Sequence, residues 1–248
     1  TDFGRPPGRY ATLSIRDLLR RETDAFPRAC RAVAQILRQL APSNRDPRAP
    51  VLVIGLGNRA VTPDAIGPLC CQNVLATRHL VEQSPEQFRA FRPVAVLAPG
   101  VLGTTGVETG ELVLGVIDRI RPELILAVDA LAARRLSRLM CTIQMTDTGI
   151  VPGSGVGNAR TALTQTALGV PVLSIGVPTV VDGATLAADI AQQSGAQCEA
   201  LDDLNTPVLV TTRDVDQQTA DAARVIGYGI NLFLHPSLDI ADMELFLS

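Results

Sequence analysis

Short apolar runs alternate with longer segments of helical hydrophobic spacing along most of this chain of 248 residues. The apolar runs predict strands at residues 51–55, 93–98, 124–129, 142–145 and 171–177, and either a strand or an extended lead-in at 208–212. Helical spacing predicts helices at residues 15–40, 65–83, 110–120, 185–193 and 214–234. Such alternation is typical of an α/β fold, so we expect a three-layer αβα sandwich with a mainly parallel sheet.

The first fifty residues have a different character from the rest. Residues 1–14 contain two prolines and two glycines and predict an irregular arm. Pro27 interrupts the helical spacing of residues 15–40, which allows two shorter helices. We therefore expect one domain overall, in which an N-terminal arm and helix at 1–50 precede an α/β domain at 51–248. The polar residues 192–206 predict a loop within that domain.

Composition narrows the class of protein. Hydrophobic residues make up 46% of the chain, which is enough for one sizeable core. A net charge of −3 and a pI of about 5.4 offer no basic surface to nucleic acid. No apolar run reaches the roughly 18 residues that cross a membrane, and no secretion signal is recognisable. Five cysteines without a C-x-x-C pair indicate reduced, mostly buried thiols, so we expect a cytoplasmic protein.

The basic residues limit the chemistry further, because all 22 of them are arginines. Without lysine, the chain has no Walker phosphate site, no Schiff base and no Ser-Lys dyad. Only His79 and His235 are present, and no G-x-S-x-G motif occurs, which disfavours a Ser-His-Asp triad and a His-rich zinc site. Acid–base chemistry therefore falls mainly to Asp and Glu.

Two aspartates follow two of the predicted strands. The apolar run at 51–54 ends in a Gly-Leu-Gly-Asn turn, and Asp64 comes seven residues after Gly57. The apolar run at 124–128 ends directly in Asp129. Ligands of open α/β sheets bind at the carboxyl ends of the strands. We therefore predict that Asp64 and Asp129 form a catalytic pair at this edge.

Each aspartate also has a structural interpretation. Asp64 precedes a predicted helix and would serve as its N-cap, a role compatible with catalysis. Asp129 would pair with Arg134 or Arg135, which follow it in the chain. Both interpretations stay open at the level of sequence.

Further residues are candidates for a supporting or substrate-binding role. Asp182 follows the apolar run of the last long predicted strand, and Asp147 lies in a Gly-rich segment, where it would otherwise form an Asx-turn. Gly55 and Gly57 allow a tight turn after the first strand, and Asn58 completes that turn. We expect this turn to shape the loop that bears Asp64.

Long stretches of the chain resemble the germination protease (GPR endopeptidase) family of spore-forming bacteria. The similarity covers most of residues 50–190, and the tail at 208–234 is a looser match. It includes VIGLGNRAVTPDAIGP, ILAVDALAARRLSRL and TIQMTDTGIVPGSGVGNAR, and is carried by residues 6–13, 53–68, 76–80, 91–113, 125–139, 142–160 and 168–185.

The resemblance implies an atypical aspartic endopeptidase that cleaves small acid-soluble spore proteins during germination. The essential aspartates of the family match Asp64 and Asp129, in VTPD and VDALA. The resemblance also implies a fold similar to hydrogenase-maturation endopeptidases, an inactive precursor that loses an N-terminal piece, a tetramer, and a location in the spore core. This interpretation needs no cofactor and no metal, and expects neither nucleic acid nor membrane as a partner.

The sequence also departs from the family. Residues near the N-terminus and after Asp189 are fewer than expected, Val151 stands where His is frequent, and Ala159 where Lys is frequent. Three alternatives therefore stay open. One is a metal-binding maturation peptidase with Asp64 and Asp129 as ligands, with or without Asp182. Another is an inactive structural or regulatory relative. A peptidyl-tRNA hydrolase is disfavoured, since His79 lies far from the GLGN turn and the chain is acidic.

Overall fold

Four parallel strands form the centre of the sheet in the computed structural model, which describes residues 6–43, 46, 48–153, 161–194 and 208–247. In spatial order they are β3 (Val94–Leu97), β2 (Val51–Gly55), β4 (Leu124–Ala133) and β6 (Val172–Asp182). Antiparallel pairing extends the sheet beyond β6, through β5 (Thr142–Thr146) to β1 (Tyr10–Ser14), while β7 (Leu209–Val210) pairs with the end of β6. The predicted α/β fold with a mostly parallel sheet is confirmed.

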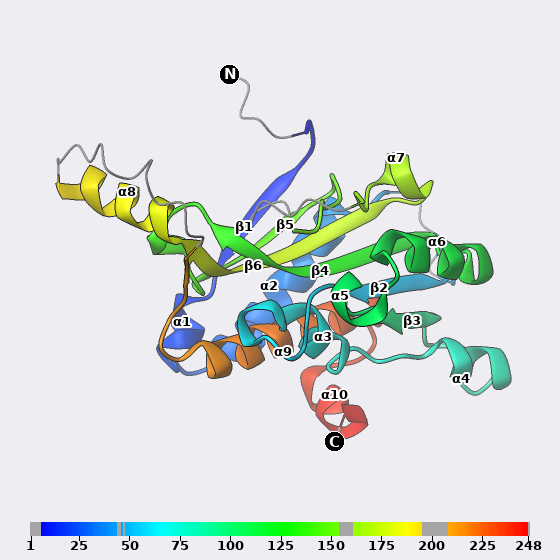
Figure 1. Cartoon of the computed structure of the whole chain (residues 1–248). Coiled ribbons are helices and arrows are strands. Elements are labelled where there is room, and N and C mark those ends of the chain that lie inside the picture. Colours follow the sequence, from blue (N-terminus) through cyan, green and yellow to red (C-terminus); the bar gives the residue numbers. More distant parts are fainter. Residues whose placement is uncertain (1–5, 44–45, 47, 154–160, 195–207, 248) are drawn as a thin grey trace.

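Helices cover both faces of this sheet, as Figure 1 shows. Side chains alternate between the faces along a strand. On one face, Val51 and Val53 of β2 pack with α2 (Ala25–Leu40), α3 (Ile66–Cys71) and α9 (Val215–Leu234). On the other face, Leu52 and Ile54 pack with α6 (Thr109–Ile120) and α7 (Gln165–Leu168). The two apolar clusters make the predicted three-layer αβα sandwich.

The remaining helices lie around these layers. Among the described residues they are α1 (Arg16–Leu19), α4 (Arg78–Gln83), α5 (Leu102–Thr105), α8 (Gly183–Ser194) and α10 (Ile240–Leu247). Two 3-10 turns, η1 (Thr62–Asp64) and η2 (Leu136–Arg138), follow β2 and β4 respectively. Figure 1 shows α8 extending away from the sheet, and α10 beneath α9 at the C-terminal end.

Two of the predicted helices are interrupted in the structure. The spacing at 15–40 belongs to α1 and α2, and Pro27 lies in the first turn of α2, where its missing N–H is tolerated. The single helix predicted at 65–83 is wrong, because α3 and α4 are separate. The Thr77 side chain bonds to Arg92 O and accepts from the Val94 N–H at 3.1 Å, which draws the chain between the helices to β3.

The expectation of an irregular arm over residues 1–14 is wrong for its second half. Tyr10–Ser14 forms β1, which pairs antiparallel with β5 along its whole length. The strand has alternating exposed and half-buried residues, a pattern that the prolines and glycines just before it obscured in the sequence. The loop predicted at 192–206 begins later than expected, since α8 extends to Ser194, and residues 195–207 lie outside the described part of the chain.

The strands β4 and β6 are both longer than the sequence predicts. β4 continues beyond Asp129 to Ala133, and β6 continues through Pro178 to Asp182. Their register shifts between Leu131 and Ala132, close to the position of Pro178, which has no N–H for the ladder. The two strands therefore run on as a pair past the end of β2, and this difference in length shapes the candidate site.

Four of the five cysteines lie in the described part of the chain. Cys30, Cys70, Cys71 and Cys141 are free thiols, two of them buried, and Cys198 lies outside the described residues. Within the described ranges, no helix combines the length and apolar character that a membrane crossing demands.

A buried polar cluster fixes the chain where β3 and β4 begin. The guanidinium of Arg92, a residue only 6% exposed, donates to Glu123 Oε2 at 2.9 Å and to Ala49 O at 2.9 Å. The backbone N–H of Arg92 donates to Nδ1 of the buried His235 at 3.4 Å. Within the described part of the chain, the Nε2 atom of His235 has no hydrogen-bond partner. Burial, and then the charge of Arg92, lower the pKa of His235 to about 4.

We predict that His235 makes stability fall in mild acid. The unfolded chain binds its proton near pH 6.5, but the folded protein only near pH 4, so the free energy of unfolding falls between these values. The loss amounts to up to about 3 kcal/mol. In His235→Asn the amide oxygen still accepts from Arg92 N–H but does not titrate, so the loss is smaller. Denaturant unfolding from pH 4 to 7 measures the difference, and His79→Asn, at an exposed histidine, serves as control. Parallel pH profiles for all three proteins would contradict the prediction.

Candidate active site

Asp64 lies on a turn that returns the chain to the end of β2. Pro63 stands in the middle of η1, where its fixed φ favours the tight helical turn. The Asp64 carboxylate points back toward the Gly-Leu-Gly-Asn segment, since the backbone N–H of Asn58 donates to its Oδ2 at 2.7 Å. A backbone donor of this kind favours the ionised carboxylate.

Gly55, Gly57 and Asn58 build the loop that holds Asp64. A Cβ atom on Gly55 would collide with the backbone oxygen of Gly67 in α3. Gly57 has a φ of +109°, and a Cβ there would collide with the backbone oxygen of Asp64. The Asn58 side chain accepts from the Ala60 N–H at 3.0 Å and closes the turn. These residues support the position of Asp64, and their contact with substrate stays a prediction.

Asp129 is the first residue of β4 beyond the end of β2. The register pairs Gly55, the last residue of β2, with Val128. On its other side β4 continues to pair with β6, and Asp129 stands opposite Gly176. Asp129 is only 6% exposed, and its Oδ1 accepts from the Ala130 N–H at 2.9 Å. The turn η1 has Cα atoms within 8 Å of both β4 and β6, and the charge of Asp64 acts on Asp129, so the two aspartates lie near each other at this edge.

Electrostatics couple the two carboxyl groups. Burial, followed by the negative charge of Asp64, raises the pKa of Asp129 to about 7, against a smaller opposing effect of the Ala130 N–H. Burial also raises the pKa of Asp64, while the N–H of Asn58 opposes the rise. The negative charge of Asp64 thus favours the protonated form of Asp129. One protonated and one ionised carboxyl group can act as general acid and general base.

The structural interpretations of both aspartates are wrong. The N-cap of α3 is Ala65, and no side chain makes a capping hydrogen bond there. Arg134 and Arg135 are exposed. Among the described residues, neither arginine is one of the groups that shift the pKa of Asp129. The pair is therefore not neutralised by the arginines that follow it.

Asp182, a candidate for a supporting role, lies well away from the pair. It is the last residue of β6, whereas Gly176, the partner of Asp129, lies six positions earlier. At the rise of a strand, this puts roughly 15–20 Å of sheet between the two aspartates. Asp182 Oδ1 accepts from the Thr185 N–H at 3.1 Å, within the first turn of α8. A direct role in the pair therefore has no support in this arrangement.

Asp147, the other candidate acid, is held by the N-terminal segment. The backbone N–H of Arg9 donates to its Oδ1 at 2.8 Å, and Arg9 Nε donates to its Oδ2 at 2.7 Å. Although burial opposes the change, these bonds from Arg9 lower the pKa of Asp147. The guanidinium also donates to Gln39 O at 2.5 Å and bonds to Leu40 O, so Asp147 helps to join β5 to α2.

The three-aspartate metal site is not assembled in the described ranges. No group of three His, Cys, Asp or Glu side chains there is placed to share a metal ion. Asp182 lies too far along β6 to serve as a third ligand beside Asp64 and Asp129.

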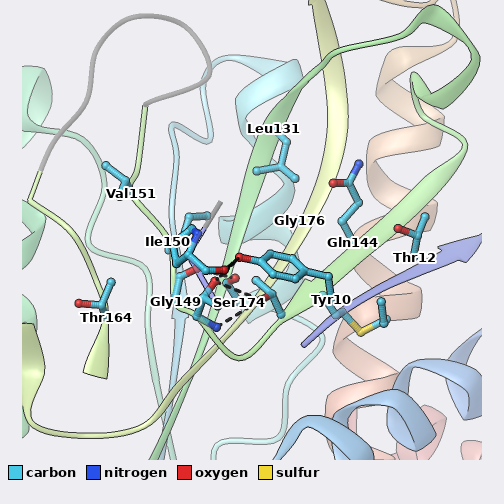
Figure 2. A pocket seen from close by; sticks show the side chains of 15 residues that line it. Tyr10, Thr12, Leu131, Gln144, Gly149, Ile150, Val151, Thr164, Ser174 and Gly176 are labelled. Atoms are coloured by element: carbon cyan, nitrogen blue, oxygen red, sulfur yellow. Dashed lines mark hydrogen bonds between the residues drawn. The ribbon is translucent and has the colours of Figure 1, made fainter. Parts of the chain in front are cut away.

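A cavity of about 270 Å³ lies along β6 and the strands beside it, and Figure 2 shows the side chains that line it. Its lining includes Gly176, the strand partner of Asp129, and Leu131 of β4. Tyr10 and Thr12 of β1 form another part of its wall. Nothing in the sequence signals this cavity, since its lining comes from separate strands, one of which lies in the segment predicted to be irregular.

The family model for germination proteases matches residues 1–194. The chain therefore belongs to the germination protease family and is a peptidase, which confirms the resemblance seen in its motifs.

Individual relatives named germination protease agree. One from Caldanaerobacter subterraneus subsp. tengcongensis is 42% identical over 99% of this chain and 84% of its own length. One from Clostridium perfringens is 37% identical over 99% of this chain and 84% of its own length. One from Bacillus cereus is 45% identical over 75% of this chain and 52% of its own length.

Among solved structures, the chain is similar to HycI, a NiFe-hydrogenase maturation protease from Thermococcus kodakarensis. The comparison covers 79% of this chain and 99% of the other, with a TM-score of 0.42 and 15% sequence identity. So low a likeness says nothing about how either chain works.

We predict that Gly57→Ala disturbs the loop of Asp64. The positive φ and the collision with the Asp64 backbone lower the free energy of unfolding by about 1–3 kcal/mol. Gly115→Ala is the matched control, because a Cβ there has no heavy atom within 4 Å and the position is an exposed site in α6. That control gains about 0.5–1 kcal/mol from helix propensity. Urea denaturation measures both, and wild-type stability in Gly57→Ala would contradict the loop geometry.

We also predict that Asp129→Asn stabilises the protein in mild alkali. The pKa of Asp129 is about 7 in the folded protein against 3.8 for a free aspartate, so wild-type stability falls as the pH rises between these values. The penalty is fully present above pH 7 and is of the order of 2–4 kcal/mol. The variant lacks it, so its advantage in thermal unfolding is largest at pH 8 and disappears toward pH 4. Asp118→Asn, on an exposed part of α6, shows no such pattern. A less stable Asp129→Asn at pH 8 would identify the carboxylate as a stabilising ion instead.

Proposed function

We propose that this peptidase is an endopeptidase of aspartic type, in which Asp64 and Asp129 carry the chemistry. The observation that carries the proposal is the burial of Asp129 at the end of β2, near the Asp64 carboxylate, an environment that raises the pKa of Asp129. The substrates are small acid-soluble spore proteins, a proposal that rests on membership in the germination protease family. By the same resemblance, the enzyme acts in the spore core, arises from an inactive precursor and assembles as a tetramer.

In this mechanism Asp64 is the base. The Asn58 N–H favours its ionised form, and burial of the carboxylate strengthens its attraction for a proton. Asp64 removes a proton from a water molecule, whose oxygen forms the new bond to the peptide carbonyl carbon. Gly55 and Gly57 hold the loop that sets the direction of this carboxylate.

Asp129 is the acid. It begins the reaction protonated and gives its proton to the nitrogen of the scissile bond as the carbon–nitrogen bond breaks. The proton taken up by Asp64 then passes to Asp129 and restores the starting protonation of both groups, so one water and one peptide bond are consumed and a carboxylic acid and an amine are formed. Neither Asp182 nor Asp147 takes part in either proton transfer.

We predict that Asp64→Asn and Asp129→Asn each lower the rate of cleavage of a small acid-soluble spore protein by about 100-fold or more. In the wild type, kcat/KM falls as the pH rises through about 7, since Asp129 loses its proton there. Asp182→Asn is the matched control, because its amide still accepts from the Thr185 N–H far from the pair, and it keeps most of the activity. Product analysis by mass spectrometry measures all three, and an active Asp64→Asn or Asp129→Asn would reject the pair.

The same assay, repeated with a chelator, separates this mechanism from the alternatives. Unchanged cleavage in the chelator agrees with the aspartate pair. Activity that is lost in the chelator and regained with a divalent metal would favour the maturation-peptidase type. A wild-type protein that binds but never cleaves the spore protein would favour the inactive relative.

A further inference from the structure

The cavity reaches the strand partner of Asp129. Gly176 lines the cavity and is the register partner of Asp129 in the β4–β6 ladder. Neighbouring strands lie about 4.8 Å apart, so the cavity begins one strand away from the Asp129 backbone. Leu131, two residues after Asp129, also lines it and packs where a side chain of residue 176 would otherwise lie.

The cavity and Asp129 share one face of the sheet. Ala127 belongs to the apolar cluster on the α6 side, and Val128 to the cluster on the α9 side. Because side chains alternate along a strand, Asp129 and Leu131 lie on the α6 side with Ala127. By the same alternation, Ser174 and Gly176 of β6 lie opposite Leu173 and Ile175, which belong to the α9 side. A peptide bound at the pair thus has the cavity beside it on the same face.

The lining of the cavity is uncharged. Its described residues are aliphatic side chains, glycines, hydroxyl groups and one amide, and none of them carries a charge at neutral pH. Two of the hydroxyls already have partners, since Ser174 Oγ donates to Gly149 O at 3.0 Å and Tyr10 Oη donates to Pro6 O at 2.7 Å. The wall therefore combines apolar surface with uncharged polar groups, some of which already have partners, and this is suited to an apolar occupant.

The size of the cavity sets the size of that occupant. A cavity of roughly 150 Å³ with an apolar lining holds a benzene molecule. The volume here is about 270 Å³, which accommodates a side chain as large as phenylalanine. At its mouth, Tyr10 and Val151 are 42% and 38% exposed, so the cavity is accessible from solvent.

We propose that this cavity is the subsite for an uncharged, apolar substrate side chain next to the scissile bond, and that Thr12, Leu131 and Gly176 set the size it accepts. The proposal rests on the proposed function of the Asp64–Asp129 pair. Glycine at position 176 leaves room for Leu131, and Leu131 in turn forms the end of the cavity nearest Asp129. A peptide chain that crosses β4 and β6 at the pair presents one of its side chains to this subsite.

A series of substrate peptides tests the assignment. The peptides differ only at one position beside the scissile bond, which is Ala, Leu or Phe. Thr12 is an exposed residue of β1 that lines the cavity, so Thr12→Phe narrows it. We expect kcat/KM for the Phe peptide to fall by about tenfold or more, while that for the Ala peptide changes by less than about threefold. Leu131→Ala shifts the preference the other way. Ser14→Phe is the matched control, on the same strand and face but outside the cavity, and keeps the wild-type preference.

Binding provides a readout that does not depend on cleavage. The chain has no tryptophan, so the emission of a peptide with Trp at the tested position reports its own surroundings. When this peptide binds to the inactive variant Asp129→Asn, we expect its emission to shift to shorter wavelength. When it is mixed with the double variant Asp129→Asn, Thr12→Phe, we expect no such shift. Identical preferences in Thr12→Phe and wild type, or no emission shift on Asp129→Asn, would overturn the subsite. If Asp64→Asn and Asp129→Asn are inactive but Thr12→Phe keeps the wild-type substrate preference, only the subsite is refuted. If Asp64→Asn or Asp129→Asn is active and Thr12→Phe has a changed substrate preference, only the aspartate pair is refuted.

Discussion

The candidate active site of this molecule depends on a mismatch in strand length. β2 stops at Gly55, opposite Val128, while β4 and β6 continue side by side. Asp129 is therefore buried at the first position where β4 has lost one neighbour, and the chain that leaves β2 returns there with Asp64. In such a poorly solvated place the charge of one carboxylate acts strongly on the other. The raised pKa of Asp129 is the consequence, and the proposed division into base and acid follows from it.

A site of this kind opposes the stability of the fold that carries it. A buried carboxyl group with an acidic neighbour favours the unfolded state at alkaline pH, since the unfolded chain releases the proton more easily. The loop of Asp64 adds a glycine with positive φ. Both features persist because the two apolar clusters hold the sheet rigidly from either face. Strain and desolvation are common at catalytic sites, and here they coincide with the two aspartates singled out by position.

The N-terminal segment adds a second layer to the site. β1 extends the sheet beyond β5, and Arg9 joins Asp147 to the C-terminal end of α2. With β1 in place, Tyr10 and Thr12 become a wall of the cavity whose other end reaches the partner of Asp129. The chain before the first parallel strand thus helps to form the surface that a substrate would meet.

The sequence by itself determined the α/β alternation, the central strands and the two candidate aspartates. Each of these is written in local patterns, because apolar runs and helical spacing reflect burial on one element, and an acid after a parallel strand falls at a sheet edge. Tertiary structure decided what depends on neighbours distant in the chain. It paired β1 with β5, interrupted the helix between α3 and α4, and put Asp182 and Asp147 away from the pair. Register, desolvation and the effect of one charge on another arise only once the strands are packed. The sequence therefore could not predict the raised pKa of Asp129 or the cavity near it.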